Sequence, residues 1–145
     1  MTVQCCEGFQ THHIGVLVKD ISKALTSYTQ CLGYEIRTGS YHDPIQTAFV
    51  QFLALPGETI LLELIAPDGP QSRLTNALKK GGGINHTCYS VPSLGDALTA
   101  LQDHGYIVIH EPQPAVAFNG RKIAWLMNRD HLLVELVECG SSDSL

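Results

Sequence analysis

Residues 11–18 read THHIGVLV, and residues 84–91 read INHTCYSV. Aligned at a spacing of 73 positions (86 − 13), the two stretches place His13 on His86. The matches that follow in the same order are Ala24-Leu25 with Ala97-Leu98, Gly33-Tyr34 with Gly105-Tyr106, and Glu63 with Glu135. An ordered series of matches at a nearly constant spacing predicts an internal duplication, and this duplication decides the fold.

Each half reads as the same series of elements, βαβββ. The first half predicts strands over residues 12–18, 34–38, 47–55 and 59–66, with a helix from an Asp20 N-cap to Gly33. The second half predicts strands over residues 84–91, 106–110, 120–127 and 131–138, with a helix from Ser93 to His104. Residues 39–46 predict a loop, and residues 72–80 predict a short helix between the halves.

Each half alone would leave one face of a small curved sheet uncovered, and two halves side by side remove that problem. We therefore expect an α+β fold in which two paired βαβββ modules form a curved, partly closed mixed sheet around a cavity. The expected single domain covers residues 1–145. It contains a first module over residues 9–70, a linker helix over 71–83 and a second module over 84–139.

The duplication places one histidine on the first strand and one glutamate on the last strand of each half, namely His13, Glu63, His86 and Glu135. Each glutamate interrupts an apolar strand, where alternation turns it away from its neighbours. A buried carboxylate needs a partner, so the four residues predict a divalent metal site for Zn, Ni, Co, Mn or Fe(II). His12 competes with His13, and the repeat register selects His13. Taken singly, such a histidine is more often a core residue whose ring nitrogens are hydrogen-bonded, and such a glutamate more often faces solvent.

Composition excludes several function classes. The 145 residues carry a formal net charge of −5, which does not favour nucleic-acid or anionic-membrane partners. No apolar run approaches the roughly 20 residues of a membrane span, and the start of the chain lacks a signal-peptide pattern. The five cysteines have no paired spacing, so we expect reduced thiols and a cytoplasmic location.

The residues resemble the vicinal oxygen chelate superfamily, which includes glyoxalases, bleomycin resistance proteins and dioxygenases. The resemblance is carried by His13-Ile14-Gly15-Val16, Glu63-Leu64-Ile65-Ala66-Pro67, the run from Gly82 to Tyr89, and Val134-Glu135-Leu136-Val137-Glu138. Within it the chain looks like the methylmalonyl-CoA epimerases, with bacterial-type glyoxalase I as a neighbouring subgroup. The glycines before Ile84, and Ser72 after the first glutamate strand, are further epimerase-like marks.

The resemblance implies a divalent metal on the four ligand positions and an isomerase that moves a proton next to a metal-bound carbonyl. Glu135 is our first candidate for the proton-transfer base, and Glu63 is the second. In the epimerases another acid/base carboxylate lies on the third strand of the first half. That place holds Val50 here, with Gln51 beside it, and neither side chain can shuttle a proton as a carboxylate does.

Candidate substrate contacts are Arg121, Lys122 and Gln51, for an acyl thioester or a hemithioacetal. For the two basic residues, a solvated strand end is the simpler reading. A homodimer is also expected.

Three other functions compete with an epimerase. The first is a glyoxalase I-type lactoylglutathione lyase. The second is an extradiol dioxygenase, which Glu63 disfavours as a fourth protein ligand because dioxygen and a catecholate need open positions. The third is a metal-free protein that sequesters a ligand. Such resistance-type proteins typically lose the metal residues, whereas all four residues are present here.

Overall fold

The computed structural model describes residues 7–140 and residue 145. The chain divides into two compact units. One unit runs from His13 to Asn85, and the other combines the chain up to His12 with the chain from His86 onward. Residues 1–6, which include Cys5 and Cys6 and the stretch without a signal-peptide pattern, lie outside the described residues.

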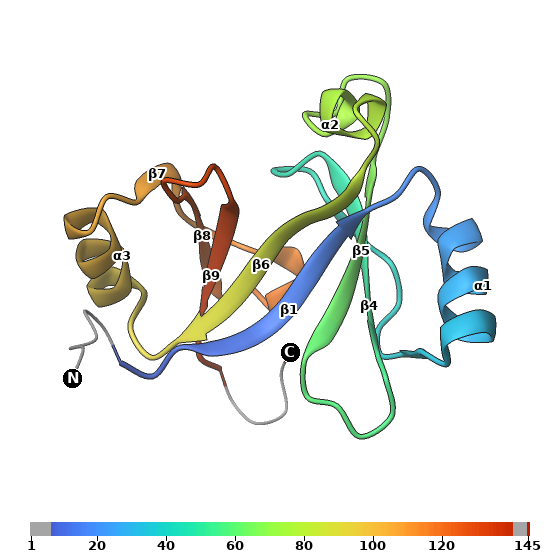
Figure 1. Ribbon diagram of the computed structural model, residues 1–145, viewed down its shortest axis with the longest axis horizontal. Helices are drawn as coiled ribbons and strands as arrows, with labels where there is room; N and C mark the ends of the chain where they lie inside the picture. Colours follow the sequence, from blue (N-terminus) through green and yellow to red (C-terminus); the bar gives the residue numbers. More distant parts are fainter. Residues whose placement is uncertain (1–6, 141–144) are drawn as a thin grey trace. The chain divides into compact units, whose positions relative to one another are not determined.

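The unit from His13 to Asn85 contains a mixed sheet with two helices (Figure 1). Its elements are β1 (Gln10–Leu17, shared at its start with the other unit), α1 (Ile21–Leu32), β2 (Glu35–Ile36), β3 (Tyr41–Asp43), β4 (Ala48–Ala54), β5 (Leu61–Pro67) and α2 (Thr75–Lys79). The strand order is β2-β4-β5-β1, and β3 also pairs with β4. β1 runs parallel to β5, whereas the other pairs are antiparallel.

Helix α1 begins and ends where the sequence predicts. The Asp20 carboxylate accepts the backbone N–H of Lys23 and the hydroxyl of Ser22. The Ser22 hydrogen bond, followed by the Lys23 N–H, holds the pKa of Asp20 below its usual value. Gly33 ends the helix at φ 82°, a left-handed conformation that glycine adopts without steric cost. The apolar side of the helix packs against Leu53, Leu62 and Leu64 of the sheet.

The other unit repeats the βαβββ series without a counterpart of β3. Its elements are β6 (Gly83–Val91, which begins in the first unit), α3 (Leu94–Asp103), β7 (Ile107–Pro114), a 3₁₀ turn (Val116–Phe118), β8 (Lys122–Met127) and β9 (Leu133–Glu138). The strand order is β6-β9-β8-β7. β6 and β9 are parallel, and the remaining pairs are antiparallel.

Helix α3 is fixed at its first turn by two oxygen acceptors. Ser93 Oγ accepts the backbone N–H of Asp96 at 3.3 Å, and Glu138 Oε1 accepts that of Leu94 at 3.1 Å. These bonds satisfy donors that an uncapped helix leaves open. The buried side of α3 forms a core with the sheet that includes Leu98, Leu126 and Leu136.

The α+β class and the two βαβββ modules are confirmed. The predicted loop over residues 39–46 is wrong, because Tyr41–Asp43 forms β3. β4 offers one long edge that β2 covers opposite Leu53 and Ala54, and β3 covers opposite residues 48–50. The edge of β4 therefore decides this strand, and the local sequence pattern does not. β7 also extends beyond its predicted end, with register irregularities that let it follow β8.

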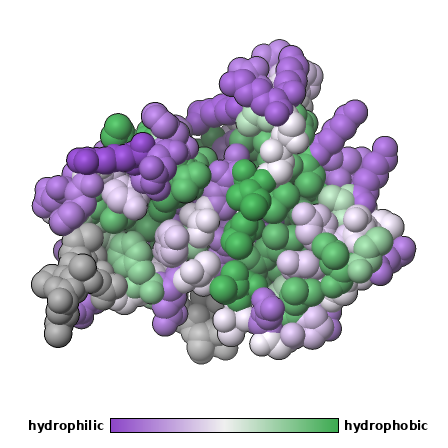
Figure 2. Space-filling model, viewed as in Figure 1, coloured by the Kyte–Doolittle hydropathy of each residue, from purple (hydrophilic) through white to green (hydrophobic). Residues whose placement is uncertain are grey.

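Helix α2 has a polar surface, and the described cysteines are free thiols. Helix α2 is covered by hydrophilic residues (Figure 2), and Lys79 and Lys80 at its end are exposed. Among the described cysteines, Cys31, Cys88 and Cys139 are free thiols. Within the described part of the chain, no helix combines the length and apolar character needed to cross a membrane.

Replacing Ser93 by alanine removes the side-chain cap of α3. We expect the free energy of unfolding to fall by about 1 kcal/mol, because the Asp96 N–H loses its acceptor. Denaturant unfolding measures the change. Ser93→Asp keeps an acceptor oxygen and is expected to retain stability. Equal stability of Ser93→Ala and the wild type would contradict this role.

Candidate metal centre

His13 and Glu63 form the first of two buried histidine–glutamate pairs. They come from the parallel neighbours β1 and β5, where Gly15 lies beside Glu63 in the register. His13 is two residues from Gly15, so both side chains lie on one face of the sheet. His13 Nε2 lies 3.5 Å from Glu63 Oε1. His13 is 0% exposed and Glu63 is 6% exposed.

His86 and Glu135 repeat this arrangement in the other unit. They come from the parallel neighbours β6 and β9, where Cys88 lies beside Glu135. His86 Nε2 lies 3.4 Å from Glu135 Oε1, and the two residues are 3% and 2% exposed. The duplication inferred from sequence therefore extends to the distance between the two side chains.

An aromatic ring packs edge-on against each histidine. The centroids of Phe52 and His13 are 5.2 Å apart at an interplanar angle of 77°. Those of Trp125 and His86 are 4.6 Å apart at 81°. Each aromatic residue lies opposite the glutamate of its own unit in an antiparallel pair. The sequence analysis missed these two residues. The signal was their spacing of 73 positions (125 − 52), which is that of the two histidines.

The two pairs have the spacing of donor atoms that share a cation. A charge-assisted hydrogen bond between nitrogen and oxygen is about 2.7–2.9 Å long, which is shorter than either pair. Two donors that each lie about 2.1 Å from one ion are roughly 3.0–3.4 Å apart at the angles of common coordination polyhedra. Imidazole and carboxylate are also the ligands that borderline divalent ions take. The residues present therefore fit a divalent metal.

A family model described as the Glyoxalase/Bleomycin resistance protein/Dioxygenase superfamily matches residues 12–125. The match covers well over half of the chain and includes the first pair and His86. The chain belongs to this superfamily.

Relatives within the superfamily include epimerases. The ethylmalonyl-CoA/methylmalonyl-CoA epimerase of Cereibacter sphaeroides is 32% identical over 130 residues, which cover 86% of this chain and 94% of that protein. The crystal structure of methylmalonyl-CoA epimerase from Mycobacterium tuberculosis is 26% identical with a TM-score of 0.80, covering 90% of this chain and 88% of that one. A hypothetical protein from Bacillus halodurans C-125 shares the fold at a TM-score of 0.84 and 24% identity, covering 96% of this chain and all of that one (100%).

Val50 and Gln51 are neighbours on β4 and lie on opposite faces of its sheet. Val50 pairs with Ile65, two residues from Glu63, and so faces the side of the metal pair. Gln51 pairs with Leu64 on the side covered by α1, where its Nε2 donates to the carbonyl of Thr38 at 2.9 Å. There it lines a cavity of about 380 Å³ beside the start of α1. Gln51 therefore does not share the face that holds Glu63.

Arg121 is held by the backbone of its own unit. Its guanidinium donates to the carbonyl of Glu138 at 2.9 Å and to the carbonyl of Leu145, and it lies over the ring of Phe118. Lys122 is exposed at the start of β8, opposite Pro114. His12 also packs edge-on against Phe118, at 5.3 Å between the ring centroids. Substrate contact by Arg121 or Lys122 stays a prediction.

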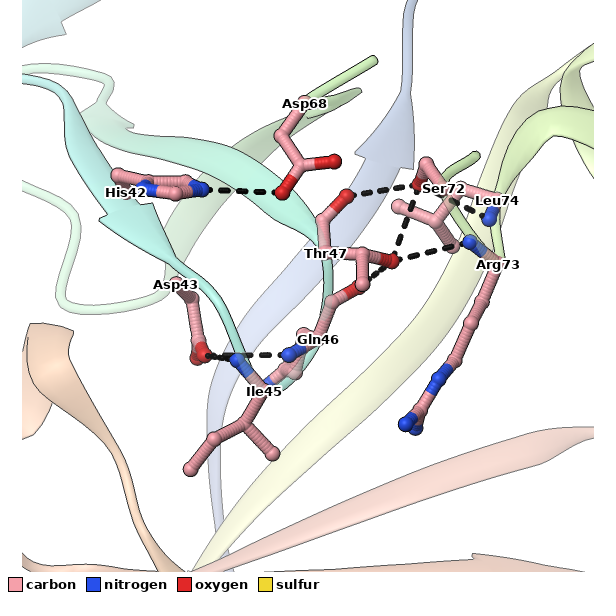
Figure 3. A network of polar contacts seen from close by, with 9 residues as sticks. All are labelled: His42, Asp43, Ile45, Gln46, Thr47, Asp68, Ser72, Arg73 and Leu74. Atoms are coloured by element: carbon pink, nitrogen blue, oxygen red, sulfur yellow. Dashed lines mark hydrogen bonds and ion pairs between the residues drawn. The ribbon is translucent and has the colours of Figure 1, made fainter. Parts of the chain in front are cut away.

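Ser72 holds together the turn before β4 and the segment before α2 (Figure 3). Its hydroxyl donates to the carbonyl of Thr47 at 2.7 Å and accepts the N–H of Leu74 at 3.1 Å. Thr47 has φ 57°, which is strained for a β-branched residue. Its own hydroxyl accepts the N–H of Arg73 at 2.9 Å. These bonds stabilise a backbone conformation that Thr47 would otherwise avoid.

Replacing Ser72 by alanine is expected to lower the free energy of unfolding by roughly 1–3 kcal/mol. The variant removes the Ser72 donor from the carbonyl of Thr47, which keeps only the N–H of Asp68 at 3.1 Å, and it removes the acceptor of the Leu74 N–H. Thermal and denaturant unfolding measure the loss. Thr75→Ala is the control, because the hydroxyl of Thr75 is exposed and makes a single hydrogen bond of 3.4 Å. Equal losses in the two variants would contradict the role given to Ser72.

Proposed function

We propose that this protein is a divalent-metal-dependent epimerase that transfers a proton next to the carbonyl of an acyl-CoA thioester. The observation that carries the proposal is the buried histidine–glutamate pair, repeated with the same geometry in both units. The likeness to the Cereibacter sphaeroides epimerase supports this reaction class and this substrate class. A homodimer and a cytoplasmic location stay predictions.

His13, Glu63, His86 and Glu135 would together hold one ion in this proposal. Each offers one ligand atom, and all four are buried. A buried carboxylate is costly to ionise without a nearby positive charge, and one cation satisfies both glutamates. The bound ion supplies positive charge that stabilises the negative charge developing on the carbonyl oxygen of the substrate.

Glu135 is our first candidate for the base, and Glu63 is the second. The C–H bond next to the carbonyl breaks, its proton passes to a carboxylate oxygen, and the electron pair moves toward the carbonyl oxygen. His86 lies beside Glu135 at 3.4 Å and Trp125 packs against His86, so the carboxylate has a fixed neighbour. A fixed carboxylate in a site that excludes water is suited to remove and return a proton at one position.

The proposal can be tested with protein that is treated with a chelator and then reloaded with Co²⁺, Ni²⁺, Mn²⁺, Zn²⁺ or Fe²⁺. We expect one ion per chain, a higher melting temperature in the loaded protein, and inversion of methylmalonyl-CoA followed by circular dichroism. Methylglyoxal with glutathione tests the lyase alternative in the same samples. A loaded protein that isomerises the hemithioacetal, and not the acyl-CoA, would replace the epimerase by the lyase.

Glu135→Gln keeps the size of the side chain and removes the base. We expect the exchange of the substrate C2 proton with D₂O to fall about 100-fold or more, measured by mass spectrometry at matched metal content. Glu63→Gln is the paired variant, since it makes the same change in the duplicate position and is expected to lose less. If Glu135→Gln is fully loaded with metal and fully active, another group is the base.

A further inference from the structure

The sheet face that carries the first histidine–glutamate pair is sealed from solvent by apolar side chains. Phe52 lies opposite Glu63 in the antiparallel register of β4 and β5. Ala54 and Leu61 lie two residues along the same two strands, and alternation places them on the same face. Phe52, Ala54 and Leu61 are 0%, 1% and 7% exposed. Solvent therefore has almost no access to these three side chains.

The duplicated positions of the other unit hold apolar side chains that solvent does reach. Trp125 lies opposite Glu135, and Met127 lies opposite Leu133, in the register of β8 and β9. The spacings from the first unit are 73 (125 − 52), 73 (127 − 54) and 72 (133 − 61). Trp125, Met127 and Leu133 are all half-buried, and we call these three residues the open strip. The two copies of the repeat therefore differ in solvent access at corresponding positions.

Trp125 connects the open strip to the second histidine–glutamate pair. Its ring packs edge-on against His86, with 4.6 Å between the centroids, and its partner in the register of β9 is Glu135. His110 of β7 lies opposite Trp125 on the outer side and is exposed. Exposure therefore rises across the sheet from Glu135, at 2%, through Trp125 to His110. A molecule that approaches Glu135 along this face meets the ring of Trp125.

The open strip favours an apolar group. The other residues of β8 and β9 on this face are Ile123 and Val137, which are buried. Alternation places Lys122 and Glu138 on the opposite face, so Glu135 is the one charged residue that these two strands present beside the strip. A charged part of a ligand would lose water there without gaining a partner, whereas an alkyl group gains from burial.

We propose that the open strip binds the alkyl group on the reacting carbon of the acyl thioester, and that Trp125 limits the size of that group. The inference rests on the proposed function and names the residues that set its substrate specificity. Directly opposite residues of an antiparallel pair have Cβ atoms roughly 4.5–5.5 Å apart. A carbon that loses its proton to Glu135 therefore has its substituents within reach of Trp125.

Trp125→Phe gives the second unit the same ring that the first unit has at Phe52, and it removes one of the two fused rings. The Co²⁺-loaded variant and wild type are compared on methylmalonyl-CoA and on ethylmalonyl-CoA, which is longer by one methylene. We expect the ratio of kcat/KM for the ethyl over the methyl compound to rise about 10-fold, because the variant leaves room for that methylene. Inversion is followed by circular dichroism at matched metal content.

Leu133→Ala is a second variant of the open strip, and Leu61→Ala is its matched control at the duplicated position. Leu133→Ala is expected to raise the same ratio, whereas Leu61→Ala, on the sealed face, is expected to leave the ratio unchanged. Melting temperatures establish that each variant is folded. An unchanged ratio in both Trp125→Phe and Leu133→Ala would overturn the inference.

Trp125 is the only tryptophan of the sequence, so its fluorescence reports on contact with a ligand without any need for turnover. Zn²⁺-loaded protein is titrated with propionyl-CoA, and with CoA as the control that lacks the acyl group. We expect a saturable change in emission that CoA at the same concentration does not produce. The double variant Tyr34→Trp, Trp125→Phe places the single tryptophan beside Tyr28 near α1, where it is expected to respond to neither compound.

The outcomes separate the role of the open strip from the proposed function. Constant Trp125 emission in a protein that inverts methylmalonyl-CoA would overturn the inference alone. Equal losses with both acyl-CoA compounds in Trp125→Phe, together with weaker metal binding, would make Trp125 only a support for His86 and would overturn it too. A loaded wild type that inverts neither compound would overturn the proposed function, and the inference with it.

Discussion

A carboxylate buried in an apolar strand must have a compensating neighbour, and this requirement governs both halves of the molecule. Glu63 lies in a strand whose other residues are almost all buried, and Glu135 lies among the buried central residues of its strand. In each half an imidazole from the adjacent parallel strand lies beside the carboxylate, at 3.5 and 3.4 Å. These distances exceed those of a strong hydrogen bond and suit a shared cation. The rest of each unit serves to hold that arrangement.

Parallel pairing is what brings the histidine and the glutamate together. Fifty residues separate His13 from Glu63 in the chain (63 − 13), and the pairing of β1 with β5 places them on one face. Parallel neighbours need a long crossover, which here includes α1 and the strands β2 to β4. The caps of α1 and α3 and the bonds of Ser72 fix the ends of these connections. These contacts lie outside the histidine–glutamate pairs and hold the connections between the strands that carry them.

Membership of the superfamily establishes the fold more firmly than the reaction. The same scaffold hosts glyoxalases, resistance proteins and dioxygenases, so chemistry has to be argued from side chains. The alternation of β4 decides which of its side chains share the face of Glu63, since it directs Gln51 toward α1 and Val50 toward the histidine–glutamate pair.

The sequence by itself determined the duplication, the α+β class, the ends of the main helices and the four candidate ligands, because each depends on local periodicity, on capping or on repeated spacing. It did not reveal β3, because that strand exists only where the edge of β4 is free to pair with it. Nor could it reveal the rings of Phe52 and Trp125 against the histidines. The distance within each pair and the faces on which Val50 and Gln51 lie were decided by strand register, since pairing between distant segments is a property of the folded sheet.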